Sequence, residues 1–207
     1  MASRTTAKVS LLRRRAPAVA AAILVAAVVP STAVAKPHHR RHRVHATRAC
    51  ANANAPVGAT SRQATKTAVV CLINKQRTAR GLPRLRESGL LDRSAQGWTN
   101  TMVATGTFTH GANFAGRISA VGFAWSSAGE NIATGFLTPR AVVNAWMGST
   151  GHCQNILNPT YTNVGSGVVH RAVGVGGNGA TWTQDFALAA RRRAPSHNFG
   201  PANGCPY

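Results

Sequence analysis

The sequence predicts an α+β domain in which helices pack on an antiparallel sheet. Segments with helical spacing of apolar residues come first along the chain, and segments rich in β-branched and aromatic residues come later. Helices followed by strands are typical of this class, whereas regular alternation of the two indicates a parallel sheet. We expect one domain over residues 49–190, a length that supports a single sizeable core.

Apolar residues three and four positions apart predict the helices. The helix with the clearest start begins at Pro139, because Thr138 is a natural N-cap and proline suits the first helical position. Gly106 is expected to end the helix before it, since glycine often closes helices. The other predicted helices cover residues 62–79 and 89–105, with a short one from Phe114 to Val121.

Two late segments, 164–170 and 181–187, have the composition of strands and are joined by a glycine-rich connection, 174–180. This order predicts a β-hairpin. The glycines also match the dinucleotide-binding pattern G-x-G-x-x-G, but that site requires a helix after the loop, and a strand-like segment follows here. A third strand is expected from Glu130 to Gly135.

The first 35 residues have the order of a secretory signal: five Lys or Arg residues, an apolar run, and a small-x-small cleavage site at 33–35. The apolar run is shorter than the roughly 20 residues of a membrane-spanning helix. Residues 36–48 then form a basic, histidine-rich arm with almost no apolar side chains, which we expect to be disordered. This arm either binds metal or an anionic polymer or serves as a solvated spacer.

The chain is strongly basic, with 24 Lys and Arg against 4 Asp and Glu and a net charge of +20. Such an excess attracts anionic partners, and it also keeps a protein soluble. Because we expect export, nucleic acid is disfavoured as a partner. A lipid, an anionic cell-wall polymer or another extracellular protein is favoured. We expect a secreted monomer, extracellular or associated with the cell wall.

Four cysteines, an even number, are expected to form two disulfides in an exported chain. None is spaced as C-x-x-C, which argues against a zinc knuckle. Three pairings are open. We predict Cys50–Cys71, which ties the start of the domain to its first helix, and Cys153–Cys205, which holds the C-terminal tail, 191–207.

Acidic residues are scarce, and Glu130 stands out because it lies among small and apolar residues. A carboxylate in such surroundings needs a buried partner, since an unpaired buried charge is costly. His110 and His152 follow two of the predicted helices, and we expect them on loops at helix ends. Side chains in such places often converge on a cleft.

Four short motifs occur in a fixed order. They are L-I-N-x-x-R at 72–77, F-T-H at 108–110, G-E-N-I-A at 129–133 and W-M-x-S-x-G-H-C-x-N-I-L at 146–157, with W-T-Q-D-F at 182–186 behind them. Over residues 66–187 the chain resembles the bacterial branch of the CAP superfamily. These are the cysteine-rich secretory, antigen 5 and pathogenesis-related 1 proteins, also called SCP-like. The resemblance implies an α-β-α sandwich with a cleft.

In animal and plant members of this superfamily, two histidines and two glutamates line the cleft. By this resemblance the cleft here is lined by His110, Glu130, Ser149 and His152, and the serine stands where the second glutamate is expected. Trp98 is a further departure, because bacterial relatives often carry a histidine there. Two imidazoles and a carboxylate suit a divalent cation, with zinc the first choice and the two histidines as its ligands. The same side chains would otherwise form a hydrogen-bonded network that braces the cleft.

We predict a non-enzymatic extracellular binding module that uses this cleft. The alternative is a metal-assisted, protease-like hydrolase with Glu130 as general base. A glycosidase requires two carboxylates beside its substrate, and the other acids, Glu87, Asp92 and Asp185, are expected to be distant. A third interpretation is a purely structural domain stabilised by its disulfides.

Overall fold

The computed structural model describes residues 49–174, 176–194 and 205; the predicted signal (1–35) and basic arm (36–48) lie outside this range. Its elements are α1 (Arg62–Thr78), β1 (Arg86–Glu87), α2 (Gly89–Thr105), α3 (Phe114–Ala120), β2 (Trp125–Thr134), α4 (Pro139–Met147), α5 (Thr150–Leu157), β3 (Asn163–Val169) and β4 (Thr181–Ala189). Among the described residues, no helix has the length and apolar character needed to cross a membrane.

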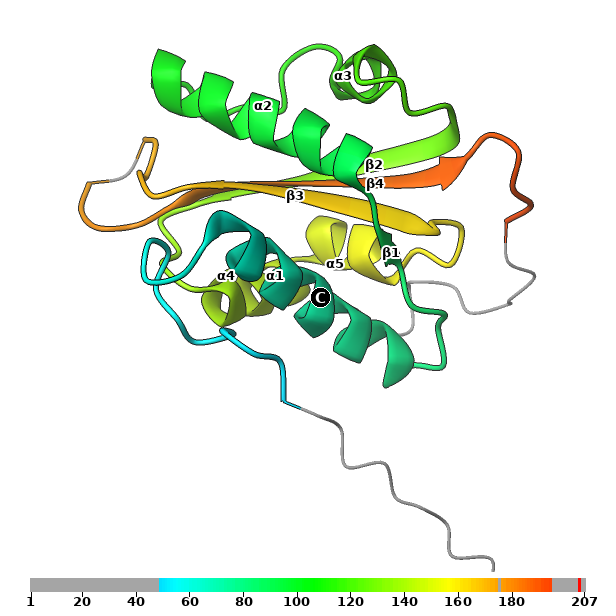
Figure 1. Cartoon of the computed structure of the whole chain (residues 1–207), viewed down its shortest axis with the longest axis horizontal. Helices are drawn as coiled ribbons and strands as arrows, with labels where there is room; N and C mark the ends of the chain where they lie inside the picture. Colours follow the sequence, from blue (N-terminus) through cyan, green and yellow to red (C-terminus); the bar gives the residue numbers. More distant parts are fainter. Residues whose placement is uncertain (1–48, 175, 195–204, 206–207) are drawn as a thin grey trace, which may run out of the picture. The chain divides into compact units, whose positions relative to one another are not determined.

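A four-stranded sheet in the order β1-β3-β4-β2 separates two layers of helices. Helices α2 and α3 cover one face, and α1, α4 and α5 cover the other (Figure 1). The three long strands pair antiparallel, whereas the two-residue β1 runs parallel to β3 and makes the sheet mixed. The predicted α+β class and the α-β-α sandwich are therefore confirmed.

The helices begin and end where local chemistry predicts. The Thr138 hydroxyl accepts a hydrogen bond of 3.2 Å from the Ala141 amide and caps α4, and Pro139 follows in the first turn. Gly106 ends α2 with a φ of 67°, in the left-handed region that favours glycine. The antiparallel pairing of β3 with β4 confirms the predicted hairpin.

Two elements differ from the prediction. Strand β2 begins at Trp125, five residues before the expected start, because it pairs along the whole of β4. The segment after α4 is a second helix, α5, and not a loop. His152 therefore lies in the first turn of a helix, which corrects its predicted place. The break between the helices is short: Gly148 ends α4 and Ser149, in extended conformation, begins α5.

Both predicted disulfides are confirmed. Cys50 pairs with Cys71 on α1, and Cys153 on α5 pairs with Cys205 in the C-terminal tail. All four sulfurs belong to the side of the sheet that holds the larger apolar core. The covalent links therefore stabilise the layer of α1, α4 and α5.

Two glycines of β3 allow α2 to approach the sheet closely. A Cβ atom on Gly165 would lie 2.2 Å from the backbone of Leu91, and one on Gly167 would lie 2.4 Å from that of Ala95. Any side chain at these positions would push α2 away from the sheet. This contact fixes the height of α2, and with it the loop that carries His110.

Candidate functional site

Glu130 of β2 is the centre of the candidate site. Its side chain is only 1% exposed, yet both of its oxygens are paired. His110 Nδ1 lies 2.8 Å from Oε1, and Arg117 of α3 contacts Oε2 through its guanidinium group. Glu130 therefore has the partner that the sequence predicts, and in fact has two: the His110 imidazole and the Arg117 guanidinium.

Trp98 of α2 contacts Arg117 and the residue before His110, and so supports both partners of Glu130. The Arg117 guanidinium lies over the Trp98 ring, 3.9 Å from its centroid, which is a cation–π contact. The indole Nε1 donates a 2.9 Å hydrogen bond to the carbonyl of Thr109 and so holds the residue before His110. The Trp98 ring thus contacts Arg117 directly and holds His110 through the backbone of Thr109, so it positions both partners of Glu130.

Arg117 was not predicted from the sequence, although a signal was present. It is the only Lys or Arg between Arg93 and Arg140, in a chain that holds 24 such residues. Glu130 is the only acid in the same stretch. A single cation and a single acid in one long neutral segment are candidates for each other's counter-ion, since neither is easily buried alone.

Asp185 of β4 also belongs to the site, which corrects the prediction that it is distant. It lies directly opposite Glu130 in the pairing of β4 with β2 and is 1% exposed. Burial first, and then the charge of Glu130, raise the pKa of the Asp185 carboxyl to about 8. Ser94 opposes this rise and lowers the pKa, but no hydrogen bond of good geometry reaches either Asp185 oxygen within the described residues. At neutral pH the carboxyl is therefore mostly protonated.

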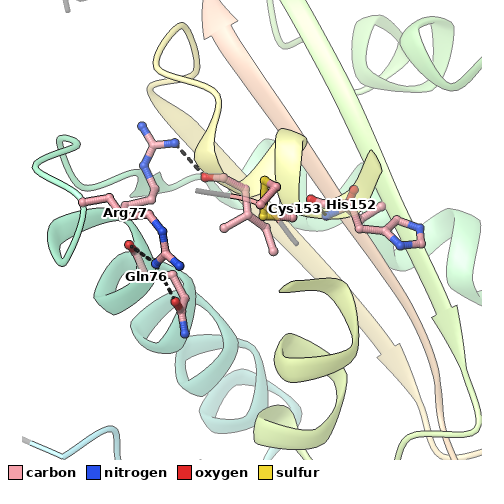
Figure 2. Close-up of a disulfide and its surroundings, with 8 residues drawn as sticks. Gln76, Arg77, His152 and Cys153 are labelled. Atoms are coloured by element: carbon pink, nitrogen blue, oxygen red, sulfur yellow. Dashed lines mark hydrogen bonds between the residues drawn. A yellow bond between two sulfur atoms is a disulfide. The ribbon is translucent and has the colours of Figure 1, made fainter. Parts of the chain in front are cut away.

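His152 is held by a set of amide side chains between β2 and α5. Asn131 Nδ2 donates to the His152 carbonyl at 3.1 Å, and Asn155 Nδ2 donates to Asn131 Oδ1 at 2.9 Å and to the Glu130 carbonyl at 3.1 Å. Figure 2 shows His152 and Cys153 leaving α5 in different directions, the cysteine toward its disulfide and the imidazole away from it. Asn131 on β2 thus holds the backbone of α5 through its side-chain amide.

His110 affects the ionisation of His152. Burial first, and then the positive charge that His110 carries when protonated, lower the pKa of His152 below its ordinary value. The His152 imidazole is consequently neutral at physiological pH and has a free lone pair. His110 is different, because its side chain is 49% exposed and one nitrogen is engaged with Glu130.

A hollow of about 280 Å³ opens beside His152, at the edge of the sheet formed by β2. Two polar side chains in the wall of the hollow come from the start of α5: Ser149, which is the N-cap, and His152. The Ser149 side chain makes no capping hydrogen bond. The rest of the wall is mainly apolar and comes from the α2–α3 loop, β2, the β2–α4 loop and α4: Phe108, Ile132, Ala133, Thr134, Phe136, Ala145 and Trp146. Phe108 is 41% exposed, an unusual position for a phenylalanine. Glu130 is too deeply buried to form part of this wall.

The side chains present do not make a complete metal site. Zinc in proteins usually has at least three protein ligands. Here His110 and His152 offer two nitrogen donors, while the Glu130 carboxylate is paired with Arg117. Within the described residues, no group of three or more His, Cys, Asp or Glu side chains is arranged to hold a metal ion. Zinc binding by the two histidines remains a prediction.

Comparison with known proteins gives one family. The sequence profile of the cysteine-rich secretory protein family, CAP, matches residues 70–186. The uncharacterized protein YkwD of Bacillus subtilis (strain 168) is 38% identical over 122 residues, which are 57% of this chain and 45% of that protein. The chain thus spans less than half the length of this relative.

Solved structures agree on the fold. An extracellular protein containing an SCP domain, from Bacillus anthracis (strain Ames), matches 61% of this chain and 41% of its own, at 25% identity and a TM-score of 0.54. An outer surface protein of Borrelia burgdorferi matches 58% of this chain and 90% of its own, at 21% identity and a TM-score of 0.52. The second likeness concerns the fold alone.

Proposed function

Because the chain belongs to the cysteine-rich secretory protein family, CAP, we propose that it is an extracellular, non-enzymatic binding module whose ligand enters the hollow beside His152. Two disulfides suit an oxidising compartment. A similar structure belongs to a protein described as extracellular. The N-terminal segment has the order of a secretory signal.

The observation that carries this proposal is the composition of the hollow. Ligand sites are typically concave and largely apolar, with a few polar groups that orient the ligand. This hollow has apolar walls, an exposed phenylalanine at Phe108, and the Ser149 hydroxyl and His152 imidazole as its polar groups. A ligand with an apolar portion and one hydrogen-bonding group fits that combination.

The state of Glu130 argues against hydrolysis. A general base needs a free lone pair within reach of the water or substrate it activates. The Glu130 side chain is 1% exposed, and His110 and Arg117 occupy its two oxygens. Asp185 is a second nearby carboxyl, but it is 1% exposed and mostly protonated at neutral pH. The Glu130 carboxylate thus holds His110 and Arg117 in place, and both carboxyls are buried away from a substrate.

Filling the hollow tests the proposal. Fatty acids of medium chain length serve as the probe, and Trp146 in the wall provides a fluorescence signal. Ala145→Leu places a larger side chain in the hollow, so we expect roughly tenfold weaker probe binding, about 1.4 kcal/mol. Asn144→Leu adds an apolar side chain to an exposed position of the same helix and is the matched control. Equal affinity of the two variants would contradict the proposal.

The metal prediction has its own measurement. The protein is loaded with zinc, dialysed, and compared with His110→Ala and His152→Ala by mass spectrometry of bound metal. About one zinc per chain, lost in both variants, would support a site completed by water or by the ligand. No retained zinc would leave His152 as a side chain of the wall of the hollow and His110 as a partner of Glu130.

A further inference from the structure

A second hollow, of about 330 Å³, lies at the other end of the strands. Three exposed arginines line it: Arg84 and Arg86, from the segment entering β1, and Arg192, just after β4. Thr162 and Asn163, at the start of β3, complete its polar wall. Segments far apart in the sequence therefore place three guanidinium groups around one concavity.

Among the described residues, no carboxylate pairs with these arginines. The chain has only four acids. Asp92 pairs with Lys66, and Glu130 pairs with His110 and Arg117. The remaining two are Glu87, which accepts hydrogen bonds from Gln63 and Thr67, and Asp185, which is buried in the sheet.

The arginines are also free of other partners. Among the described residues, no side-chain hydrogen bond or ion pair is formed by Arg84, Arg86 or Arg192. The acids of the described residues do not balance their charge, because each has its own partners or is buried. Three like charges around one hollow repel one another, and an anion placed between them relieves that repulsion.

We propose that this arginine pocket binds the phosphate groups of an anionic phosphodiester polymer. The guanidinium group presents its donors in a planar fork that matches phosphate oxygens, which suits arginine better than lysine for this role. Asn163 adds a donor: its Oδ1 accepts from the Thr162 hydroxyl at 3.0 Å, which leaves the amide NH₂ group available. A phosphate in the hollow would meet donors on several sides.

The surroundings favour a polymer over a membrane or a nucleic acid. Binding to a lipid surface usually adds exposed apolar side chains that enter the bilayer. The aromatic side chain of the pocket, Phe123, is only 9% exposed, so it can neither enter a bilayer nor stack on a base. The large positive charge of the chain, +20, draws a long polyanion to the surface, and the pocket gives one of its phosphates a specific place.

This inference goes beyond the proposed function, because the pocket and the hollow beside His152 share no residue. Phe123 precedes the first residue of β2, whereas Ile132 and Thr134 lie at its far end. At about 3.3 Å per residue, the strand separates the two sites by on the order of 30 Å. Either site can therefore exist without the other, and a variant of one should leave the other unchanged.

The test compares two triple variants of the full chain. One replaces Arg84, Arg86 and Arg192 by glutamine, and the other replaces Arg62, Arg93 and Arg171, which are exposed and lie outside the pocket. Both lose the same charge. Binding of a synthetic poly(glycerol phosphate) oligomer is measured by calorimetry, with melting temperatures as the check on folding.

We expect the pocket triple to bind the oligomer roughly tenfold more weakly than the control triple, since three direct phosphate contacts are lost. Inorganic phosphate should compete with the oligomer on the unaltered protein, which gives a result that needs no variant. Equal losses in the two triples, or no competition by phosphate, would overturn the proposal.

Two further probes separate the sources of phosphate. They are single-stranded DNA of equal charge and vesicles of phosphatidylglycerol with phosphatidylcholine. We expect both to bind the two triples alike, because only general charge acts on them. If the pocket triple selectively lost the vesicles or the DNA and kept the oligomer, a membrane or nucleic-acid site would replace the one proposed here.

Discussion

The two faces of the sheet have different contents. The face covered by α1, α4 and α5 holds the larger apolar core and both disulfides. The face covered by α2 and α3 holds a small apolar cluster around Leu91 and Ile118, together with the buried carboxyls of Glu130 and Asp185. Alternation along β4 produces the contrast, since Trp182 and Phe186 point to the first face and Asp185 to the second.

The buried polar groups of the two faces have different roles: those on the face of α1, α4 and α5 stabilise the fold, and those on the face of α2 and α3 form the candidate site. On the apolar face even the buried cation is structural: Arg77 is fully buried and donates to the carbonyls of Pro83, Ile156 and Asn158, each at 2.8 Å. On the other face the buried groups form a chain from Asp185 through Glu130 to the exposed His110. We therefore expect substitutions on the first face to change stability, and those on the second to change the ionisation of the site.

The largest effect should come from the apolar face. Trp182 is 1% exposed, and its indole donates a 2.8 Å hydrogen bond to the Phe136 carbonyl. Trp182→Ala leaves a cavity and an unpaired carbonyl, so we expect a loss of about 3–5 kcal/mol in the free energy of unfolding. Urea denaturation measures it. Ile118→Ala on the other face should cost less, about 2–3 kcal/mol, because its cluster is smaller. A larger cost for Ile118→Ala would contradict the contrast.

The disulfide of the same face comes next. Cys153 and Cys205 are 52 residues apart, so their bond closes a long loop. Replacing both cysteines by serine should lower the free energy of unfolding by about 2–4 kcal/mol. Because Cys153 adjoins His152, the variant should also disturb the hollow. Unchanged stability, with full binding of the fatty-acid probe, would show that the tail contributes nothing.

The polar face should respond to pH instead. The pKa of Asp185 is raised from 3.8 to about 8 in the folded protein, so the folded state holds a proton that the unfolded state has lost. Stability should therefore fall as pH rises from about 4 to about 8, by up to about 1.4 kcal/mol per pH unit, and then level off.

Asp185→Asn removes this titration while keeping the shape of the side chain. We expect the variant to lose most of the pH slope and to gain on the order of 1–2 kcal/mol at pH 7 to 8. Folding then no longer requires the uptake of a proton, and the burial of an amide without a hydrogen-bond partner offsets part of that gain. Thermal unfolding at several pH values measures both. A variant that keeps the slope of the unaltered protein would show that another group carries the proton.

The sequence predicted what depends on local chemistry. The helix α4 follows from Thr138 and Pro139, the end of α2 follows from Gly106, and the disulfides follow from export and their place in the chain. The motif resemblance identified His110, Glu130 and His152. Each helix signal lies within a residue or two of the helix end that it marks, so the local sequence contains it.

The sequence did not predict what depends on long-range pairing. Asp185 lies beside Glu130 only because β2 and β4 pair in one particular register, which no local pattern specifies. Arg117 reaches Glu130 because Trp98 supports it from another helix. The helix α5 was missed because Gly148 and Gly151 interrupt its apolar pattern, although Ser149 begins it. The polar face was therefore harder to predict than the apolar one.

The smallest effect concerns the place where the two faces meet, at the β2 edge. His110 belongs to the polar face and His152 to α5 on the apolar face, and their only link is electrostatic, since burial and the charge of His110 both lower the pKa of His152. In His110→Ala the charge is removed and the burial remains. The His152 pKa should then rise but stay below its ordinary value, as measured by NMR titration of the imidazole.

A His152 pKa that does not move in His110→Ala would mean that the two imidazoles are too far apart to act together. They would then be unable to share a ligand or a metal ion, and the hollow would have to hold its ligand through Ser149 and His152 alone. A rise all the way to 6.5 would mean that burial contributes nothing, so that the wall of the hollow is more open to water than its apolar side chains indicate. A His152 pKa that rises but stays below its ordinary value would show that His110 and His152 are close enough to belong to one site.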